Sequence, residues 1–206
     1  MIDLKLKEKS KDAFKAVRKA LVADIHTTGS TFLGYDEYGK AQFDNTHTPM
    51  GSFVYRLKKH NAQDPSVIPQ IVDLLAKDRD FLSLINDIDV IVPIPPSKKI
   101  RFIQPTIAVA QEISNRFNKP MQKDFILSSN TEQVKALEIS ERYDAVKKGL
   151  SLTPDVIFNK NTKILLFDDV LESASTVKAI MDVLTSDGYT DVSVLILTIK
   201  RTSELE

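Results

Sequence analysis

The sequence contains no cysteine, and its three histidines are scattered along the chain. The missing cysteines exclude disulfide bonds and cysteine-ligated zinc. Three histidines that are far apart in the sequence make a poor zinc site. A disulfide-stabilised or zinc-dependent fold is therefore not expected.

The formal net charge is zero, because 28 basic side chains balance 28 acidic ones. A balanced chain has no overall field that would draw it to nucleic acid or to a membrane, so we predict no strong nucleic-acid binding, although a local basic patch stays open. No apolar run approaches the roughly 18 residues of a membrane span. The first residues, MIDLKLKEKSK, carry charges where a signal peptide needs its apolar core. We expect a soluble, cytoplasmic protein with no membrane partner.

The length and composition favour one hydrophobic core. A chain of 206 residues with 42% hydrophobic content can bury one good core. We predict a single domain over residues 1–206, in which 1–86 form an appendage or hood and 87–201 form the core. Oligomeric state cannot be derived from the sequence, and a homo-oligomer stays open.

Residues 163–176, KILLFDDVLESAST, combine the features of a phosphate site. The apolar run 164–167 predicts a strand buried on both faces. Asp168 and Asp169 stand where that run ends, and the small or polar residues 172–176 follow. In an open α/β sheet such a loop and the helix after it present backbone N–H groups to an anion at the carboxyl edge.

A helix is predicted directly after this loop. Its apolar residues recur at helical spacing, and Gly188 is a natural residue for the C-terminal cap. They are Val177, Ile180, Met181 and Leu184.

Residues 89–105, DVIVPIPPSKKIRFIQP, form the second informative stretch. Val90 to Val92 predict a buried strand, and the prolines after it prevent its continuation. A basic cluster follows at Lys98, Lys99 and Arg101. Pro105 then opens an apolar-periodic helix as its first residue.

The other elements follow from periodicity and punctuation. Residues 4–25 have apolar residues at three- and four-residue spacing among lysines, which predicts an amphipathic helix. Residues 32–45 alternate around a turn at Tyr38-Gly39, which predicts a β-hairpin. Helices are predicted over 48–60, capped by Thr48, over 68–85 and over 131–149, with a short strand near 123–127. Helical segments connect three of the apolar runs, which predicts that these runs are parallel neighbours in one sheet: 89–92, 164–167 and 192–199. The short strand near 123–127 is expected to join the same sheet.

The stretch 163–176 resembles the signature with which type I phosphoribosyltransferases bind phosphoribosyl pyrophosphate (PRPP), written roughly Asp-Asp-Val-x-Thr-Thr-Gly-x-Thr. Asp168, Asp169, Val170 and Thr176 match it, and Ser173 replaces a threonine. Ala174 stands where the family has glycine. If that position needs a positive φ, alanine costs roughly 1–2 kcal/mol.

Four further segments are similar to the ComF-like branch of that family. They are MGSFVYRLKKHN (50–61), VPIPPS (92–97), RFIQPTIAVA (101–110) and VSVLILTIKR (192–201). The resemblance covers roughly residues 45–201. The branch's N-terminal cysteine zinc module is absent, and residues 1–44 stand in its place.

Residues 24–31, DIHTTGST, match the PRPP consensus better letter for letter. The segment before them, 13–23, is charged and helix-patterned, and a hairpin rather than a helix follows them. Motifs carry weight only in their structural setting. We therefore expect residues 24–31 to be a turn from helix to hairpin.

The resemblance implies a type I phosphoribosyltransferase-like α/β fold, an open and mainly parallel sheet flanked by helices, with an N-terminal helix and β-hairpin as extension. It also implies a site for PRPP or a nucleotide 5′-phosphate, with Mg²⁺ as cofactor. The residues implied for PRPP or phosphate binding are Asp168, Asp169, Glu172, Ser173, Ala174, Ser175 and Thr176. Those implied for pyrophosphate are Pro96, Ser97, Lys98, Lys99 and Arg101. Mg²⁺ would be held by Asp168 and Asp169 through PRPP and water.

The implied reaction is phosphoribosyl transfer to or from a small nitrogenous acceptor, with pyrophosphate as leaving group, in nucleotide metabolism. Asp168, Asp169 and Glu172 are the catalytic candidates. Glu172 takes the place in which purine-salvage relatives carry an aspartate general base, so it could accept or relay a proton.

Whether the chain is an enzyme stays open at this point. The alternative is a catalytically inactive module that binds PRPP or a nucleotide and assists partners in DNA uptake or processing. Loss of the loop glycine is what such a change could look like. The sequence does not name the acceptor.

Overall fold

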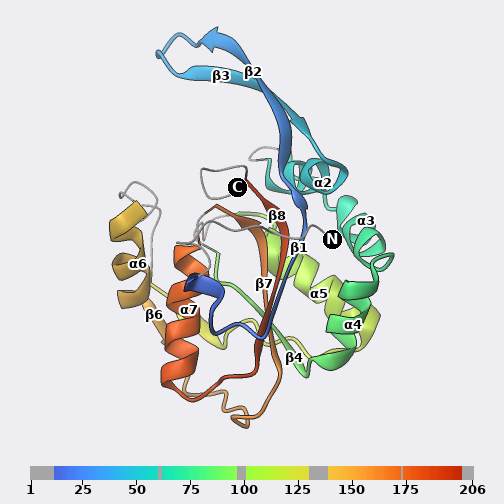
Figure 1. The fold of residues 1–206 in the computed structure, drawn as a ribbon. Coiled ribbons are helices and arrows are strands. Elements are labelled where there is room, and N and C mark those ends of the chain that lie inside the picture. The colour runs from blue at the N-terminus through green and yellow to red at the C-terminus, as the bar shows by residue number, and fades with distance from the viewer. Residues whose placement is uncertain (1–11, 60–61, 97–100, 130–138, 173, 201–206) are drawn as a thin grey trace.

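The computed structural model describes residues 12–59, 62–96, 101–129, 139–172 and 174–200. They include a four-stranded parallel sheet in the order β1-β8-β7-β4, with helices on both faces (Figure 1). Its strands are β1 (Lys19–Ile25), β4 (Val90–Pro93), β7 (Ile164–Leu171) and β8 (Val192–Ile199). The prediction of an α/β fold with a parallel sheet flanked by helices is confirmed. The runs 89–92, 164–167 and 192–199 are parallel neighbours, as predicted.

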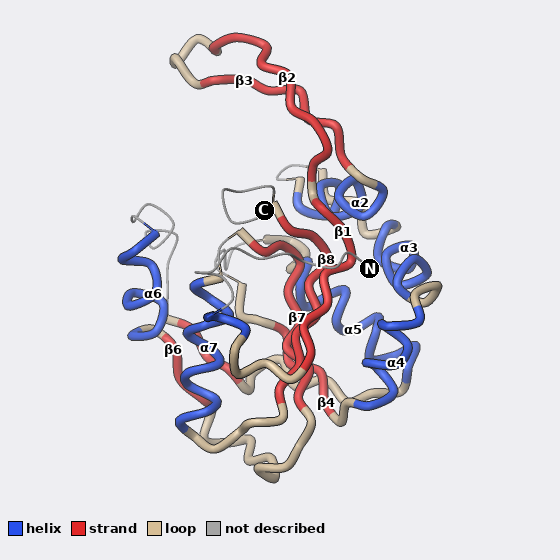
Figure 2. Tube along the Cα trace, in the orientation of Figure 1, coloured by secondary structure: helices blue, strands red, loops and turns tan. Residues whose placement is uncertain are grey.

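Two helical layers cover the sheet (Figure 2). One layer consists of α2 (Pro49–Lys58), α3 (Val67–Leu75), α4 (Arg79–Asp87) and α5 (Pro105–Phe117). The other contains α7 (Ser175–Ser186), with α6 (Ile139–Lys148) packed beside it. This arrangement produces two hydrophobic cores, one on each face of the sheet.

Alternation along the strands divides the side chains between these cores, because successive residues of a strand point to opposite faces. In β7, Leu165 and Phe167 join the core of α2 to α5, whereas Ile164 and Leu166 join the core of α7. All four side chains are fully buried. Burial on both faces explains why residues 164–167 of this strand are an unbroken apolar run in the sequence.

The helix predicted over residues 4–25 is wrong at its C-terminal end, because residues 19–25 form strand β1. This strand pairs in parallel with β8, with Leu21 opposite Leu195 and Ile25 opposite Ile199. Short apolar runs fit both periods, and here pairing with a neighbouring strand overrides the helical pattern. The segment before residue 87 therefore supplies part of the main sheet as well as the hairpin.

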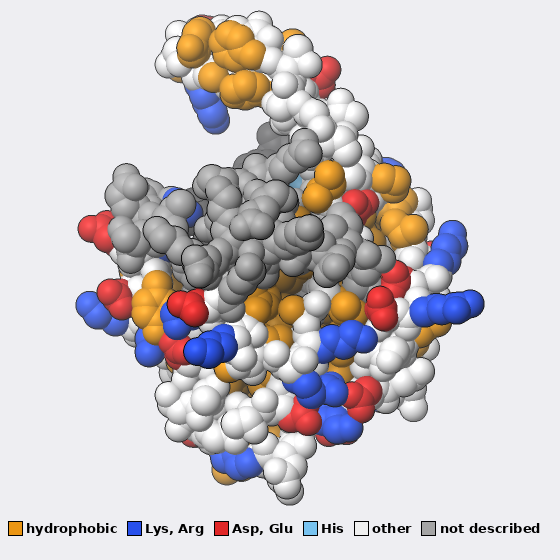
Figure 3. Space-filling model, viewed as in Figure 1, with side chains coloured by type: hydrophobic (Ala, Val, Ile, Leu, Met, Phe, Trp, Pro, Cys, Tyr) orange, Lys and Arg blue, Asp and Glu red, His pale blue; other side chains and the backbone are white. Residues whose placement is uncertain are grey.

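The predicted hairpin is confirmed as β2 (Thr27–Tyr35) and β3 (Ala41–His47), which pair antiparallel. Gly39 has a φ of 74° in the turn, a conformation that glycine adopts without strain. The hairpin projects from the body (Figure 1), and hydrophobic side chains gather on it (Figure 3). Its exposed large hydrophobic residues are Phe32, Leu33, Tyr35, Tyr38 and Phe43.

The short strand predicted near 123–127 does not join the main sheet. Instead β5 (Ile126–Ser128) pairs antiparallel with β6 (Leu150–Leu152) in a separate two-stranded sheet. Only Met121 forms a single parallel bridge, with Ile91. A turn at Lys123 and Asp124 then carries the chain away from β4.

The helix predicted over 68–85 is two helices, α3 and α4. Asp78 separates them, since its carboxylate accepts hydrogen bonds from the backbone N–H groups of Asp80 (2.8 Å) and Phe81 (3.0 Å) and so caps α4. The start of α2 is as predicted: Thr48 caps it and Pro49 is its first residue. Pro105 likewise begins α5.

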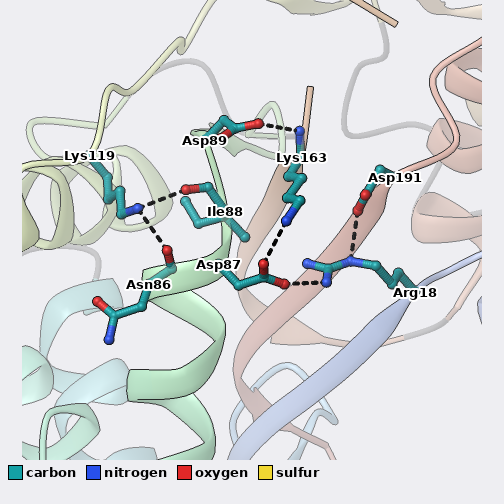
Figure 4. Close-up of polar contacts among 8 residues, drawn as sticks. All are labelled: Arg18, Asn86, Asp87, Ile88, Asp89, Lys119, Lys163 and Asp191. Atoms are coloured by element: carbon teal, nitrogen blue, oxygen red, sulfur yellow. Dashed lines mark hydrogen bonds and ion pairs between the residues drawn. The ribbon is translucent and has the colours of Figure 1, made fainter. Parts of the chain in front are cut away.

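A network of ion pairs joins the amino ends of the four parallel strands (Figure 4). Arg18, just before β1, pairs with Asp87 and, through Nε at 2.7 Å, with Asp191 before β8. Lys163, just before β7, contacts Asp87 Oδ1 through Nζ at 2.7 Å. Hydrogen bonds from Lys163 and Arg18 lower the pKa of Asp87 to about 2.

We expect Asp87→Asn to flatten the acid side of the stability profile. Because the pKa of Asp87 is lower in the folded chain than the ordinary value of about 3.9, its stabilisation is complete above that value. It is lost as the pH falls towards 2. Thermal unfolding at pH 2, 4 and 7 should show a steeper loss below pH 4 for the wild type than for Asp87→Asn. Asp124→Asn, in an exposed turn, serves as the control; equal slopes in wild type and Asp87→Asn would contradict the assignment.

Candidate functional site

The two adjacent carboxylates lie inside β7, because this strand continues to Leu171, past the end predicted at Phe167. Asp169 is buried, with 6% of its surface exposed. Its Oδ1 lies 3.0 Å from Nζ of Lys58, on α2. Successive strand residues point to opposite faces, so α2 reaches Asp169 rather than Asp168.

Asp168 is the electrostatically unfavourable member of the pair. Its Oδ1 accepts a hydrogen bond from the backbone N–H of Asp169 at 2.8 Å. Burial, followed by the neighbouring charge of Asp169, raises the pKa of the Asp168 carboxyl to about 7, and Lys58 acts in the opposite direction. Carboxylates perturbed in this way occur at functional sites more often than elsewhere.

We expect Asp168→Asn to stabilise the protein at neutral and higher pH. A carboxyl whose pKa is raised by folding costs stability once the pH exceeds its unfolded value of about 3.9, and the cost is complete above about 7. The asparagine can still accept the Asp169 N–H. Thermal unfolding should show a higher midpoint for the variant at pH 8 and little difference at pH 4. A lower midpoint at pH 8 would contradict the assignment.

The predicted phosphate loop runs from β7 into α7. Glu172 forms an ion pair with Lys200, which follows β8. Ser173 lies outside the described residues. Ala174 occupies the cap of α7 with a φ of −74°, so the strain considered for alanine at this position does not arise. Ser175 and Thr176 are half-buried in the first turn of the helix.

The start of α7 has no side-chain cap, since Ala174 offers no acceptor to the first N–H groups. Helix α7 is the element that follows the strand with Asp168 and Asp169, and it begins at the carboxyl edge of the central strands. Helix N-termini carry a partial positive charge and unpaired donors that suit an anion.

The predicted pyrophosphate residues follow the neighbouring strand. Pro93 of β4 pairs with Phe167 of β7, and the N–H of Ile94 donates to the Phe167 carbonyl at 2.8 Å. The chain beyond β4 therefore leaves the sheet beside Asp168. Pro96 and Arg101 are half-buried on either side of this segment. Ser97, Lys98 and Lys99 lie outside the described residues.

Sequence reasoning missed a second group at the same edge, on the other side of β7. His26 follows β1, and its Nδ1 lies 3.0 Å from Oγ1 of Thr198 in β8. The hydroxyl of Thr198 donates to the backbone carbonyl of Asp169 (3.3 Å). His26 is thereby connected to the acidic pair through one side chain.

A pocket of about 490 Å³ lies between the base of the hairpin and this edge of the sheet. Its lining residues include His26, Asn45, His47, Tyr55 and Lys200, and Thr27, Thr28 and Ser30 add hydroxyl groups. The rings of His47 and Tyr55 stack at 4.9 Å between centroids, and those of His26 and His47 meet edge to face at 5.1 Å.

Residues 24–31 are not the turn between helix and hairpin that the sequence predicted. They run from the end of β1 through His26 into β2. Of the two grounds against a phosphate loop here, the helix expected before these residues is wrong, because residues 19–25 are a parallel strand, whereas the hairpin expected after them is confirmed. Had residues 19–25 been predicted as a strand of the parallel sheet, His26 would have been expected at the carboxyl edge of that sheet, because it follows the strand directly.

Burial lowers the pKa of His26 to about 4. The positive charges of His47, Lys200 and Lys58 act in the same direction, and Asp169 opposes them. At neutral pH, His26 is therefore an uncharged imidazole. It can accept a proton or a hydrogen bond through one of its nitrogens.

Among the described residues, no group of three or more His, Cys, Asp or Glu side chains is placed to hold a metal ion. No helix in the described part of the chain is long and apolar enough to cross a membrane. Comparison of the sequence with models of known protein families gives no match, and comparison with curated proteins gives none either.

Proposed function

We propose that this protein is a phosphoribosyltransferase, which binds PRPP or a nucleotide 5′-phosphate at the carboxyl edge of its sheet and exchanges the phosphoribosyl group between pyrophosphate and a nitrogenous acceptor. The observation that carries the proposal is the pair Asp168–Asp169. Both carboxylates lie in a central parallel strand, one against Lys58 and one with a raised pKa, directly before a short loop and a helix N-terminus.

The 5′-phosphate would bind at residues 172–176. The uncapped first turn of α7 supplies backbone N–H donors, and Ser175 and Thr176 supply hydroxyl groups. Glu172 would repel a phosphate, at roughly 4 kcal/mol for charges about 4 Å apart at an effective dielectric of 20. Its ion pair with Lys200 reduces that repulsion.

The ribose hydroxyls would bind Asp168 and Asp169, directly or through Mg²⁺. The donor set fits this ion, since Mg²⁺ prefers oxygen ligands and commonly takes one or two carboxylates while keeping several waters. Bound Mg²⁺ would supply charge neutralisation for the pyrophosphate group. Lys58 already balances one of the two carboxylates, which keeps the acidic pair from repelling the phosphates of PRPP.

The pyrophosphate would face the segment after β4, at Pro96 to Arg101. Lys98, Lys99 and Arg101 carry the positive charges proposed to offset the leaving group. Such a reaction depends on orientation and charge neutralisation more than on a strong nucleophile. Glu172 stays the sequence-based candidate for the group that accepts the acceptor's proton.

Release of pyrophosphate tests the activity. Wild-type protein with PRPP and Mg²⁺ is expected to release pyrophosphate when a nitrogenous acceptor is added, and Asp169→Asn is expected not to. Asp87→Asn, at the opposite edge of the sheet, is the matched control and should behave like the wild type. PRPP binding without release for any acceptor would favour the inactive binding module instead.

A further inference from the structure

The pocket at the base of the hairpin lies on the side of β7 away from the proposed pyrophosphate segment, and its lining residue Lys200 is paired with Glu172 of the proposed phosphate loop. The sheet order β1-β8-β7-β4 puts the segment after β4 on one side of the acidic pair. His26 and Lys200, which follow β1 and β8, lie on the other side and line the pocket. In a displacement, the entering and leaving groups occupy opposite sides of the reacting carbon, so this order separates them correctly.

We propose that this pocket is the acceptor subsite, that it takes a small planar nitrogen heterocycle with a ring N–H, and that Nε2 of His26 accepts that hydrogen. The inference rests on the proposed phosphoribosyl transfer for its chemistry. The pocket itself and its preference for a heterocycle do not depend on that transfer.

The shape and chemistry of the lining select a planar ring. Tyr55 stacks on His47 and is still 48% exposed, so part of its ring surface is available to a second ring. Aromatic side chains bind the π-face of any base in this way. The volume of about 490 Å³ is in the range of small-molecule sites.

The polar groups of the lining suit a neutral or anionic heterocycle. Asn45 and the three hydroxyl groups can donate or accept hydrogen bonds, and Lys200 is a cation. None of the described residues that line the pocket carries a carboxylate, and Lys200 is paired with Glu172, which is not among them. The described lining therefore offers a cationic ligand no negative charge of its own.

The hydrogen-bond network assigns the tautomer of His26. The single hydroxyl proton of Thr198 is donated to the Asp169 carbonyl, so Thr198 Oγ1 must accept from Nδ1–H of His26. Nε2 of the neutral ring then carries a lone pair. His47 is oriented in the same manner, because its Nδ1 donates to the His26 backbone carbonyl at 3.0 Å.

The charged groups around His26 keep it in this state. Burial, and then His47, Lys200 and Lys58, disfavour a second proton on the ring and lower its pKa, and Asp169 opposes them. A proton taken up by Nε2 during the reaction would be stabilised by the negative charge of Asp169, which raises the pKa of His26, whereas Thr198 contacts only the backbone carbonyl of Asp169. Glu172 is less suited to this task, since its carboxylate is already paired with Lys200.

The proposed step exchanges one bond at the anomeric carbon for another. A bond forms between the ring nitrogen and the anomeric carbon of PRPP, and the bond from that carbon to the pyrophosphate oxygen breaks. The electron pair of the broken bond leaves with pyrophosphate. The proton of the ring nitrogen passes to Nε2 of His26.

The experiment measures binding of adenine, hypoxanthine and uracil by saturation-transfer NMR, and pyrophosphate release from PRPP with Mg²⁺. Tyr55→Ala is expected to weaken binding of whichever heterocycle binds the wild type by roughly 5- to 150-fold, the range for a lost base–aromatic stack. Its PRPP affinity should stay within about twofold. Tyr38→Ala, at the hairpin turn and 86% exposed, is the matched control and should change neither quantity.

A second variant tests the proton acceptor. His26→Asn can keep a polar partner for Thr198 but has no second ring nitrogen. We expect kcat to fall by roughly 10²–10⁴-fold, as for a lost acid–base group, with the KM for PRPP nearly unchanged. The heterocycle methylated at the reacting nitrogen should bind without being turned over.

The two proposals fail differently. Heterocycles that do not bind the wild type, or that bind Tyr55→Ala equally well, overturn the acceptor subsite even if PRPP binds. Tyr55-dependent binding of a heterocycle together with no binding of PRPP overturns the transferase and leaves the pocket as a heterocycle site. An unchanged kcat in His26→Asn overturns the role of His26.

Discussion

Gly51→Ala is expected to destabilise the protein by about 1–3 kcal/mol or more, because a methyl group at this position has no room. A Cβ on residue 51 would lie 2.1 Å from the backbone carbonyl oxygen of His26 and 2.9 Å from its carbon. Both are backbone atoms and cannot rotate away. The first turn of α2 and the end of β1 would have to separate.

That separation would also break the contacts that join α2 to the edge of the sheet. The hydroxyl of Thr48 donates to the Ile25 carbonyl at 2.6 Å and accepts the N–H of Gly51 at 3.0 Å. His26 follows Ile25, its backbone lies against Gly51, and it lines the pocket. We therefore expect heterocycle binding to be lost together with stability in this variant.

Thermal unfolding tests the prediction, with a midpoint lowered by roughly 2–12 °C for a chain of this size. Gly29→Ala is the matched control, since a Cβ there meets only the Thr46 side chain, at 4.0 Å. A Gly51→Ala protein as stable as Gly29→Ala would show that α2 does not approach β1 as described.

Asp169→Asn is expected to weaken PRPP binding by roughly 10- to 150-fold, the worth of a hydrogen bond to a charged group. The substitution removes the buried carboxylate from the proposed ribose or Mg²⁺ site and leaves Lys58 without its ion pair. The extra positive charge cannot compensate, because the ribose hydroxyls need an acceptor.

Glu172→Gln should have the opposite effect on affinity. It removes an anion beside the phosphate loop and releases Lys200 from its ion pair. Calorimetric titration with PRPP and Mg²⁺ is expected to give an affinity equal to the wild type or higher. Equal losses of affinity in Asp169→Asn and Glu172→Gln would mean that Glu172 is structural and that the two carboxylates do not have separate roles.

The turnover of Glu172→Gln separates the two candidates for proton acceptor. A loss of roughly 10²–10⁴-fold is expected if Glu172 takes the proton. Our account of His26 predicts a change within about twofold for Glu172→Gln and assigns the large loss to His26→Asn. Thermal unfolding of each variant checks that the fold is retained.

The central strands could be predicted from the sequence because local pattern and global fold agree there. Residues 164–167 and 192–199 carry apolar side chains on both faces. This pattern is typical of a strand that is covered by helices on both sides. Thr48 with Pro49, and Pro105, gave correct helix starts because caps and prolines act through local backbone geometry.

The elements that failed depend on partners distant in the sequence. Residues 19–25 carry a helical pattern and become a strand only through pairing with β8, about 170 residues later. Residues 126–128 pair with 150–152 rather than with the main sheet. Neither pairing can be predicted from a short stretch of sequence, because a short apolar run fits the helical and the strand periodicity equally well.

The same limit explains which half of the site was predicted. Asp168, Asp169 and the loop 172–176 are contiguous, so their order alone indicates a phosphate site. Lys58 and Tyr55 come from α2 and His26 follows β1, and these two elements reach the same edge only after β1 joins β8. A site assembled by sheet pairing leaves no motif in the sequence.

Calorimetric titration with PRPP and Mg²⁺, on the wild type and on Asp169→Asn, tests the central claim most directly. The account predicts saturable binding to the wild type, a roughly 10- to 150-fold weaker affinity in Asp169→Asn, and wild-type affinity in Asp87→Asn at the opposite edge of the sheet. Neither heat nor a thermal shift for the wild type at millimolar PRPP would contradict it. Equal affinity in wild type and Asp169→Asn would contradict the assignment of the acidic pair.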